Sequence, residues 1–203
     1  MTTKLVLALD PGFASCGYAV LAPGAIPSED RVVMIGVLRT KLSPKKHRVM
    51  SADDNIRRCR EIASPLESLM VSASLDYIHR PYGGLFENRS LVRLVCAEKM
   101  SFPRNSSAAA KMAMTWGLIV GNLHRFGLPL VQASPQQVKK TSAGDSSATK
   151  DQVEKAMVKR FGKGLYRMLK GVPETQHEHA FDALAVGVTC LDSEEGRMVR
   201  TLG

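Results

Sequence analysis

Three acidic side chains stand where apolar residues would be the default. Asp10 and Glu98 each end an apolar run typical of a buried strand, and Asp182 interrupts an otherwise apolar helical segment. His179 precedes Asp182 by three residues, which places both side chains on one helix face. Buried carboxylates that converge repel one another unless a cation lies between them, and hard oxygen ligands suit Mg²⁺ or Mn²⁺. The four residues are therefore candidates for a two-metal site that hydrolyses phosphodiesters.

Each of these residues alone also fits an ordinary structural role. Asp10 begins an Asp-Pro-Gly turn signal, Glu98 could form a strand-end pair with Lys99, and Asp182 could lie on a helix surface. A single histidine such as His179 is more often structural or exposed than a ligand. The combination of the four, rather than any one, favours the metal site.

The hydrophobic pattern predicts an α/β fold that would bring these residues together. Short connections join the first three predicted strands, which favours antiparallel neighbours, whereas the later strands alternate with helices and should be parallel. The predicted strands are 5–9, 17–21, 32–40, 91–97 and 128–133, and the predicted helices are 51–70, 105–126, 148–161 and 178–191. We expect Pro65 to kink or divide the first helix. If strands 5–9 and 91–97 are parallel neighbours, Asp10 and Glu98 meet at one sheet edge.

Length and composition limit the domain organisation. The 203 residues suit a single domain over 1–203, with an insertion around 76–90, where proline and glycines stand among charged and aromatic residues. The four cysteines have no paired spacing, which argues against a zinc site or a disulfide framework and suits the cytoplasm. Charges, glycines or prolines interrupt every apolar stretch before it reaches membrane-spanning length, so no membrane association is expected.

The formal net charge of +9 suggests a polyanionic partner such as nucleic acid, although it could serve solubility alone. Lys139, Lys140 and Lys150 flank a Gly/Ser-rich turn where the backbone can approach a phosphate closely. A second basic run lies at 159–170 and could hold another duplex. Both segments could instead be solvated surface.

Four segments resemble the RuvC-type crossover junction endodeoxyribonucleases, which are Holliday-junction resolvases of the RNase H-like superfamily. They are LALDPGFASCGYAV, VCAEKMSFPRNSSAAAKMAMTWG, PQQVKKTSAGDSSATKDQV and HAFDALAVGVT. The family's metal-site positions fall on Asp10, Glu98, His179 and Asp182. Its basic positions fall on Lys139 and Lys150.

The resemblance implies an RNase H-like, five-stranded mixed sheet, three strands antiparallel and then parallel strands, flanked by helices. It implies a homodimer that uses two Mg²⁺ ions per active site, with Mn²⁺ able to substitute, and no nucleotide cofactor. Each subunit would nick one of two like-polarity strands of a four-way DNA junction, as in recombination and repair. His179 would complete the metal site or orient the attacking water.

The sequence departs from the family pattern at several positions. The aromatic residue that wedges into the junction is replaced by Ser101, so the neighbouring Phe102 is the candidate for DNA contact. Ser146 replaces the second glycine of the basic turn. The 76–90 segment has no counterpart in the compact family pattern.

Three other functions fit parts of the sequence. An actin- or Hsp70-like ATPase also places an acid and a glycine after its first strand, but 203 residues are too few for its two lobes. A non-catalytic junction-binding module predicts disrupted acidic positions, and these are intact. An RNase H-like nuclease for other branched DNA or for RNA is the strongest competitor. The host could be a bacterial cell, or an infected cell if the chain is viral.

Overall fold

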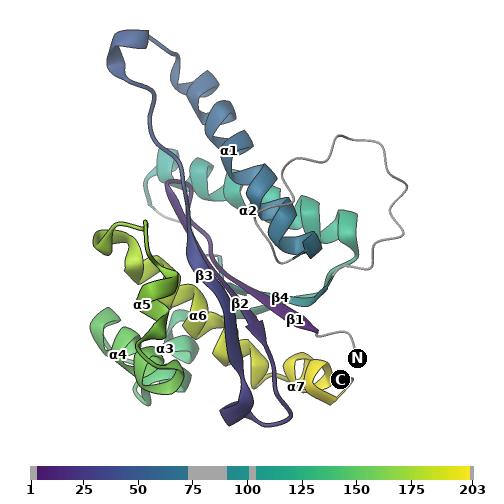
Figure 1. Ribbon diagram of the computed structural model, residues 1–203. Coiled ribbons are helices and arrows are strands. Elements are labelled where there is room, and N and C mark those ends of the chain that lie inside the picture. The colour runs from purple at the N-terminus through teal and green to yellow at the C-terminus, as the bar shows by residue number, and fades with distance from the viewer. Residues whose placement is uncertain (1–3, 73–90, 101–103, 202–203) are drawn as a thin grey trace.

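A five-stranded mixed sheet forms the centre of the fold (Figure 1). The computed structural model describes residues 4–72, 91–100 and 104–201. The strand order is β3-β2-β1-β4-β5, with β1, β2 and β3 antiparallel and β4 and β5 parallel to β1. The strands are β1 (Leu5–Asp10), β2 (Ser15–Ala22), β3 (Arg31–Arg39), β4 (Val92–Glu98) and β5 (Leu130–Ala133). This arrangement confirms the predicted five-stranded mixed sheet.

Helices cover both faces of the sheet (Figure 1). One face carries α1 (Ser51–Ser72) and α2 (Ser106–Phe126). The other carries α3 (Pro135–Ala143), α4 (Lys150–Phe161), α5 (Gly164–Met168), α6 (His177–Leu191) and α7 (Glu194–Thr201). Side chains alternate between the two faces of β1: Val6 and Ala8 pack towards α6, whereas Leu7 and Leu9 pack towards α1 and α2. Strand β1 is therefore apolar on both sides, and its one polar residue, Asp10, lies at its end.

Helix α6 lies directly against the backbones of β1 and β2 because glycines stand at the contact. A Cβ atom on Gly17 would lie 1.9 Å from the carbonyl oxygen of His179, and one on Gly187 would lie 2.8 Å from Cβ of Ala8. Real Cβ atoms do not approach other atoms so closely. The absence of side chains at Gly17 and Gly187 thus sets how near α6 lies to the sheet.

One sequence prediction about helices needs correction. Pro65 does not divide α1, which continues from Ser51 to Ser72. Burial of Ile62, Leu66 and Leu69 along one helix face outweighs the hydrogen bond that proline cannot donate.

The segment that follows β5 is a helix that the sequence analysis missed. It forms α3, which the hydrophobic pattern did not predict. Ser134 accepts a hydrogen bond from the amide of Gln137, the Gln137 side chain accepts one from the amide of Ser134, and Pro135 occupies the first turn. The sequence also gave no prediction of α5 or α7, and the predicted insertion at 76–90 lies outside the described residues.

A buried carboxylate joins three distant parts of the chain. The Asp30 side chain is 0% exposed and follows the turn between β2 and β3. It accepts hydrogen bonds of 2.9 Å from Nη2 of Arg160 on α4 and 2.9 Å from Nη2 of Arg200 on α7. The two guanidinium groups compensate the buried charge and fasten both helices to the hairpin.

Replacing Asp30 with alanine should destabilise the protein by about 3–5 kcal/mol, because Arg200 would be left buried without its counter-charge. Urea unfolding monitored by circular dichroism measures this change. Glu174→Gln, at an exposed carboxylate, is the control and should change the free energy of unfolding by less than about 0.5 kcal/mol. Equal stabilities of Asp30→Ala and the control would contradict a structural role for this ion-pair cluster.

No helix in the described part of the chain is both long and apolar enough to cross a bilayer.

Candidate active site

The carboxyl ends of β1 and β4 bring two acidic residues to the same edge of the sheet. Leu9 pairs with Ala97 in parallel register, so Asp10 and Glu98 occupy the next row. Parallel strands lie about 4.8 Å apart, which places the two residues side by side. The prediction that strands 5–9 and 91–97 are parallel neighbours is therefore confirmed.

Helix α6 adds the other two predicted residues from the adjacent face. Nδ1 of His179 lies 2.9 Å from Oδ2 of Asp10, within hydrogen-bond distance. Asp182 follows one turn later on the same helix face, and its side chain is 21% exposed. Gly17 pairs with Asp10 across the sheet and also contacts the backbone of His179, so the close approach of α6 positions this histidine.

Lys150, the first residue of α4, binds two acidic side chains of α6. Its Nζ lies 2.9 Å from Oε2 of Glu178 and 3.4 Å from Oδ2 of Asp182. The position of Lys150 is fixed by a capping box in which Thr149 and Gln152 exchange hydrogen bonds. Sequence reasoning did not identify Glu178, because an acid in the first turn of a helix is common and gives no distinct signal.

The charges of this cluster are strongly coupled. Burial, together with the nearby charges of Asp10 and Asp182, raises the pKa of Glu98 from 4.5 to about 7. Burial and the charge of Asp10 raise the pKa of Asp182 from 3.8 to about 6, against an opposing effect of Lys150. The hydrogen bond to Asp10 raises the pKa of His179, although its burial acts in the opposite direction. The site thus holds more negative charge than its cationic neighbours neutralise.

The donor types suit a hard divalent cation, because carboxylate oxygens and an imidazole nitrogen are common ligands of such ions. Among the described residues, however, no three His, Cys, Asp or Glu side chains lie close enough together to hold one ion. Asp10 is hydrogen-bonded to His179, and Asp182 is paired with Lys150. Burial and, after it, the repulsion between the carboxylates raise the pKa values of Glu98 and Asp182, and a bound cation would relieve both effects.

The predicted DNA-contacting residues differ in where they lie. Lys139 is half-buried on α3, and its charge, like that of Lys150, acts to lower the pKa of Glu98. Lys140 is the next residue on the helix and is exposed. Phe102 lies outside the described residues.

Comparison with known proteins identifies the family of this chain. The family model described as "Crossover junction endodeoxyribonuclease RuvC" matches residues 85–190, which is more than half of the chain. The chain belongs to the RuvC family. This match covers three of the four candidate metal-site residues, and Asp10 lies before it.

Individual RuvC proteins match over nearly the whole chain. The crossover junction endodeoxyribonuclease RuvC of Synechococcus sp. (strain CC9311) is 29% identical over 188 residues, covering 91% of this chain and 96% of the relative. The structure of T. thermophilus RuvC in complex with Holliday junction substrate superposes with a TM-score of 0.62 at 25% identity, covering 97% of each chain. The yeast mitochondrial Holliday junction resolvase Ydc2 shares the fold, with a TM-score of 0.54 at 11% identity and coverage of 98% of this chain and 83% of Ydc2. These likenesses confirm the predicted RNase H-like resolvase fold.

Glu98→Gln should stabilise the protein at pH 7.5 in the presence of a chelator, because it removes one of the repelling carboxylates. The folded state keeps the Glu98 proton up to about pH 7, whereas an unfolded chain releases it near 4.5. Folded wild type therefore binds more protons in this window, and its stability falls as pH rises from about 4.5 to about 7. The variant should lose part of that dependence, which urea unfolding at pH 5 and pH 7.5 measures.

Glu174→Gln provides the matched control and should retain the pH dependence of the wild type. A Glu98→Gln protein that is less stable than wild type at pH 7.5 would show that Glu98 makes favourable contacts that outweigh the repulsion.

Proposed function

We propose that this protein resolves four-way DNA junctions by paired, metal-dependent hydrolysis of phosphodiester bonds. The observation that carries the proposal is the placement of Asp10 and Glu98 at one sheet edge, with Asp182 of α6 near enough to raise the pKa of Glu98, in a chain of the RuvC family. The family consists of metal-dependent nucleases, and the T. thermophilus relative was solved with Holliday junction substrate. Such an activity serves DNA recombination and repair.

Asp10, Glu98 and Asp182, with His179, would hold two Mg²⁺ ions, for which Mn²⁺ could substitute. The ions would supply a polarised water and neutralise charge on the phosphate oxygens. His179 would orient the attacking water while its Nδ1 remains close to Asp10. The burial and mutual repulsion that raise the pKa values of Glu98 and Asp182 support a bound cation at this position.

Lys139 and Lys150 would contact the phosphates beside the scissile bond and stabilise the developing negative charge. Both side chains act electrostatically on Glu98, which supports their placement next to the reacting phosphate. Lys140 would contact the DNA backbone further from the cut, since it is exposed on the same helix. Phe102 stays a candidate for the residue that wedges into the junction.

The Asp10→Asn protein should lose cleavage by about 10³-fold or more while it still binds the junction. An immobile four-way junction with one labelled strand at a time, incubated with Mg²⁺, reports the nicks on denaturing gels. The wild type should cut two like-polarity strands symmetrically, and Glu174→Gln should match it.

Other outcomes of the same assay identify the alternatives. Tight binding by wild type without cleavage under any divalent metal would leave a non-catalytic junction-binding module. Preferential cutting of flaps, forks or RNA hybrids over the four-way junction would identify a nuclease for other branched substrates.

We infer further that the protein acts as a homodimer, and that the outer face of α2 forms the interface. Val120 is 52% exposed on this helix, and a Cβ atom at Gly117 or Gly121 would meet nothing within 4 Å. This face is therefore open, and its small residues allow another helix to approach closely. Two sites related by two-fold symmetry suit the two-fold symmetry of a four-way junction.

Val120→Arg should convert the dimer to a monomer and replace paired nicks by slow single nicks, because a charge would be buried at the interface. Light scattering coupled to size-exclusion chromatography measures the mass. Val33→Arg makes the same change at an exposed valine of the edge strand β3 and should stay dimeric. A wild-type protein that is monomeric at all concentrations would contradict the dimer.

We propose that residues 1–203 form a single nuclease domain, which the one continuous sheet with a core on each face supports.

The cytoplasm of a bacterial cell, or of an infected host for a viral chain, is its proposed location. The bacterial RuvC relatives and four free cysteines support that assignment.

A further inference from the structure

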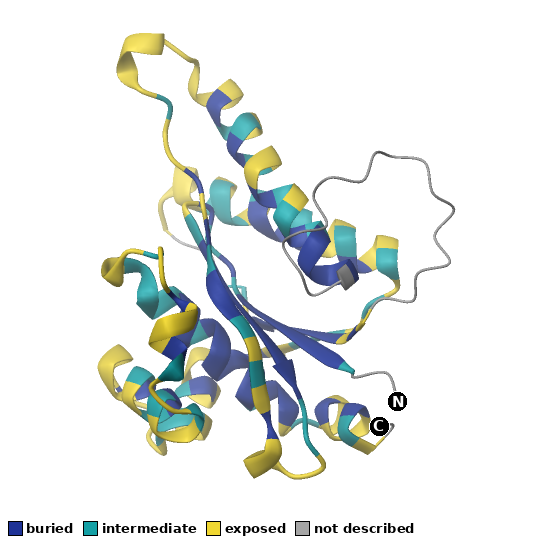
Figure 2. Ribbon diagram, viewed as in Figure 1, coloured by how far each residue is buried: buried dark blue, intermediate teal, exposed yellow. Residues whose placement is uncertain are grey.

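A strongly basic segment leaves the sheet at the end of β3. Residues 39–48, called the basic arm below, hold five cationic side chains and no acidic one: Arg39, Lys41, Lys45, Lys46 and Arg48. All five residues are exposed. The arm projects beyond the sheet and leads into the N-terminus of α1 (Figure 2). It is set apart from the basic turn at Lys139–Lys150.

The cations of the arm are available for a partner. Within residues 4–72, 91–100 and 104–201, no ion pair involves any of the five. Several other basic residues are engaged: Arg57 binds Asp54, and Arg160 and Arg200 bind Asp30. Unpaired like charges on one short segment repel one another, and phosphates would relieve that repulsion.

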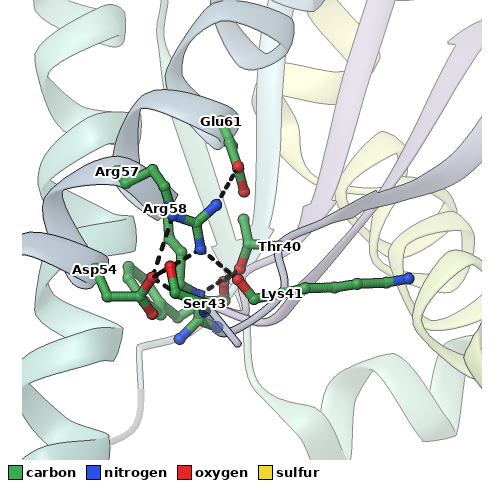
Figure 3. A network of polar contacts seen from close by, with 8 residues as sticks. Thr40, Lys41, Ser43, Asp54, Arg57, Arg58 and Glu61 are labelled. Atoms are coloured by element: carbon green, nitrogen blue, oxygen red, sulfur yellow. Dashed lines mark hydrogen bonds and ion pairs between the residues drawn. The ribbon is translucent and has the colours of Figure 1, made fainter. Parts of the chain in front are cut away.

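The base of the arm is held by a network of polar contacts (Figure 3). Asp54, which is 5% exposed, accepts hydrogen bonds from the amide of Ser43 at 3.2 Å and from Nε of Arg57 at 3.1 Å. Arg57 also donates to the carbonyl oxygen of Lys41. The Lys41 side chain points away from this network (Figure 3). The network therefore holds the backbone of the arm at Lys41 and Ser43 and leaves the Lys41 ammonium group outside these contacts.

A second set of contacts joins the arm to the loop that follows Asp10. Nε of the buried Arg58 donates to Oγ1 of Thr40 at 2.9 Å, and Oγ1 of Thr40 donates to the carbonyl oxygen of Phe13 at 2.8 Å. The Arg58 guanidinium lies 4.4 Å from the centre of the Phe13 ring. Phe13 is three residues beyond Asp10, so these contacts join the arm to the loop that begins at the acidic site.

The register of the sheet places the arm at the same edge as the acidic site. Gly17 pairs with both Asp10 and Val37, and Arg39 lies two residues further along β3. With strands about 4.8 Å apart and a rise of about 3.3 Å per residue, the backbone of Arg39 lies about 12 Å from that of Asp10. This distance corresponds to roughly three or four base-pair steps of duplex DNA.

A hollow of about 500 Å³ is lined by residues of β3, of the base of the arm and of α1. Arg39 and Lys41 line one wall, and Arg57 and Glu61 line the other. Because Arg57 is paired with Asp54 and Glu61, the two cations of the first wall give this hollow its net positive charge.

We propose that the basic arm binds the phosphate backbone of the DNA duplex that extends from the acidic site, and thereby anchors one duplex of the branched substrate. The assignment rests on the proposed junction-resolving function. It adds a contact on the β3 side of the cluster, opposite the lysines of α3 and α4. The contact is to backbone phosphates rather than to bases, because unpaired lysines on an exposed segment neutralise charge without reading sequence.

The test is a triple variant, Lys41→Ala/Lys45→Ala/Lys46→Ala, titrated with a labelled four-way junction in chelator at several salt concentrations. Arg48 is kept, since its backbone φ of 50° lies in the left-handed region that alanine disfavours. The variant should bind about 10- to 100-fold more weakly at low salt. The slope of log affinity against log salt should become shallower by about 2–3, one unit for each lost phosphate contact.

A matched control removes three cations at the opposite end of the strands. Arg31→Ala/Arg93→Ala/Arg197→Ala changes exposed residues at the start of β3, near the start of β4 and on α7. It should bind the junction within about two-fold of wild type with an unchanged slope. Equal weakening by the two triple variants would overturn the proposal, because net charge would then explain the effect.

The remaining outcomes separate the arm from the proposed function. If wild type binds and cuts the junction but the arm variant keeps both affinity and salt slope, the arm assignment alone is wrong. If wild type neither binds nor cuts the junction, the proposed function fails and the arm assignment fails with it. The arm also exposes Leu42, so phosphatidylserine vesicles are tested in parallel. If the arm variant loses the vesicle binding of wild type but keeps its DNA binding, the proposal is wrong and the partner of the arm is a membrane surface.

Discussion

Parallel pairing of β1 with β4 is the constraint on which the rest of this structure depends. It aligns the ends of two strands that are distant in sequence, and each of these strands ends in an acid. Apart from the exposed Arg93 near the start of β4, the residues that precede these acids are apolar and buried, so the two carboxylates lie at the sheet edge. A shift of one residue in this register would bury an acid between the helices, where its charge would be far more costly. The hydrophobic core therefore enforces the proximity of groups that repel one another.

The surrounding helices partly compensate that repulsion. α6 provides His179 against Asp10, and α4 provides Lys150 against Asp182 and Glu178. Each compensating residue stands within the first turns of its helix, so helix ends rather than loops determine the geometry. The positive charges of the chain have two roles. Arg160 and Arg200 stabilise the fold by pairing with Asp30, whereas the cations of the basic arm remain unpaired near the acidic edge.

Much of this arrangement could be predicted from the sequence because it follows from local patterns. Apolar runs ended by acids predicted β1 and β4, and the spacing of His179 and Asp182 predicted their shared helix face. Other features depend on tertiary contacts. Arg160 belongs to a basic run in the sequence, yet it is committed to Asp30, whose burial no local pattern reveals. Helix α3 is short and polar, so its hydrophobic periodicity is weak, although the Ser134–Gln137 capping box was a readable signal. Pro65 was expected to kink or divide α1, yet the helix is undivided, because the core contacts of its neighbours stabilise it.

The close contact between Gly17 and the backbone of His179 has a consequence for how changes in this protein are interpreted. Gly17 carries no functional group, yet even a methyl group there would force the first turn of α6 away from the sheet. The imidazole would move with that turn and lose its alignment with Asp10. A loss of activity caused by a change at this position would thus measure the spacing between a helix and a strand. The substitutions that position 17 tolerates therefore indicate how closely α6 must lie to β2 for the protein to work. They report on this spacing while every catalytic group remains intact.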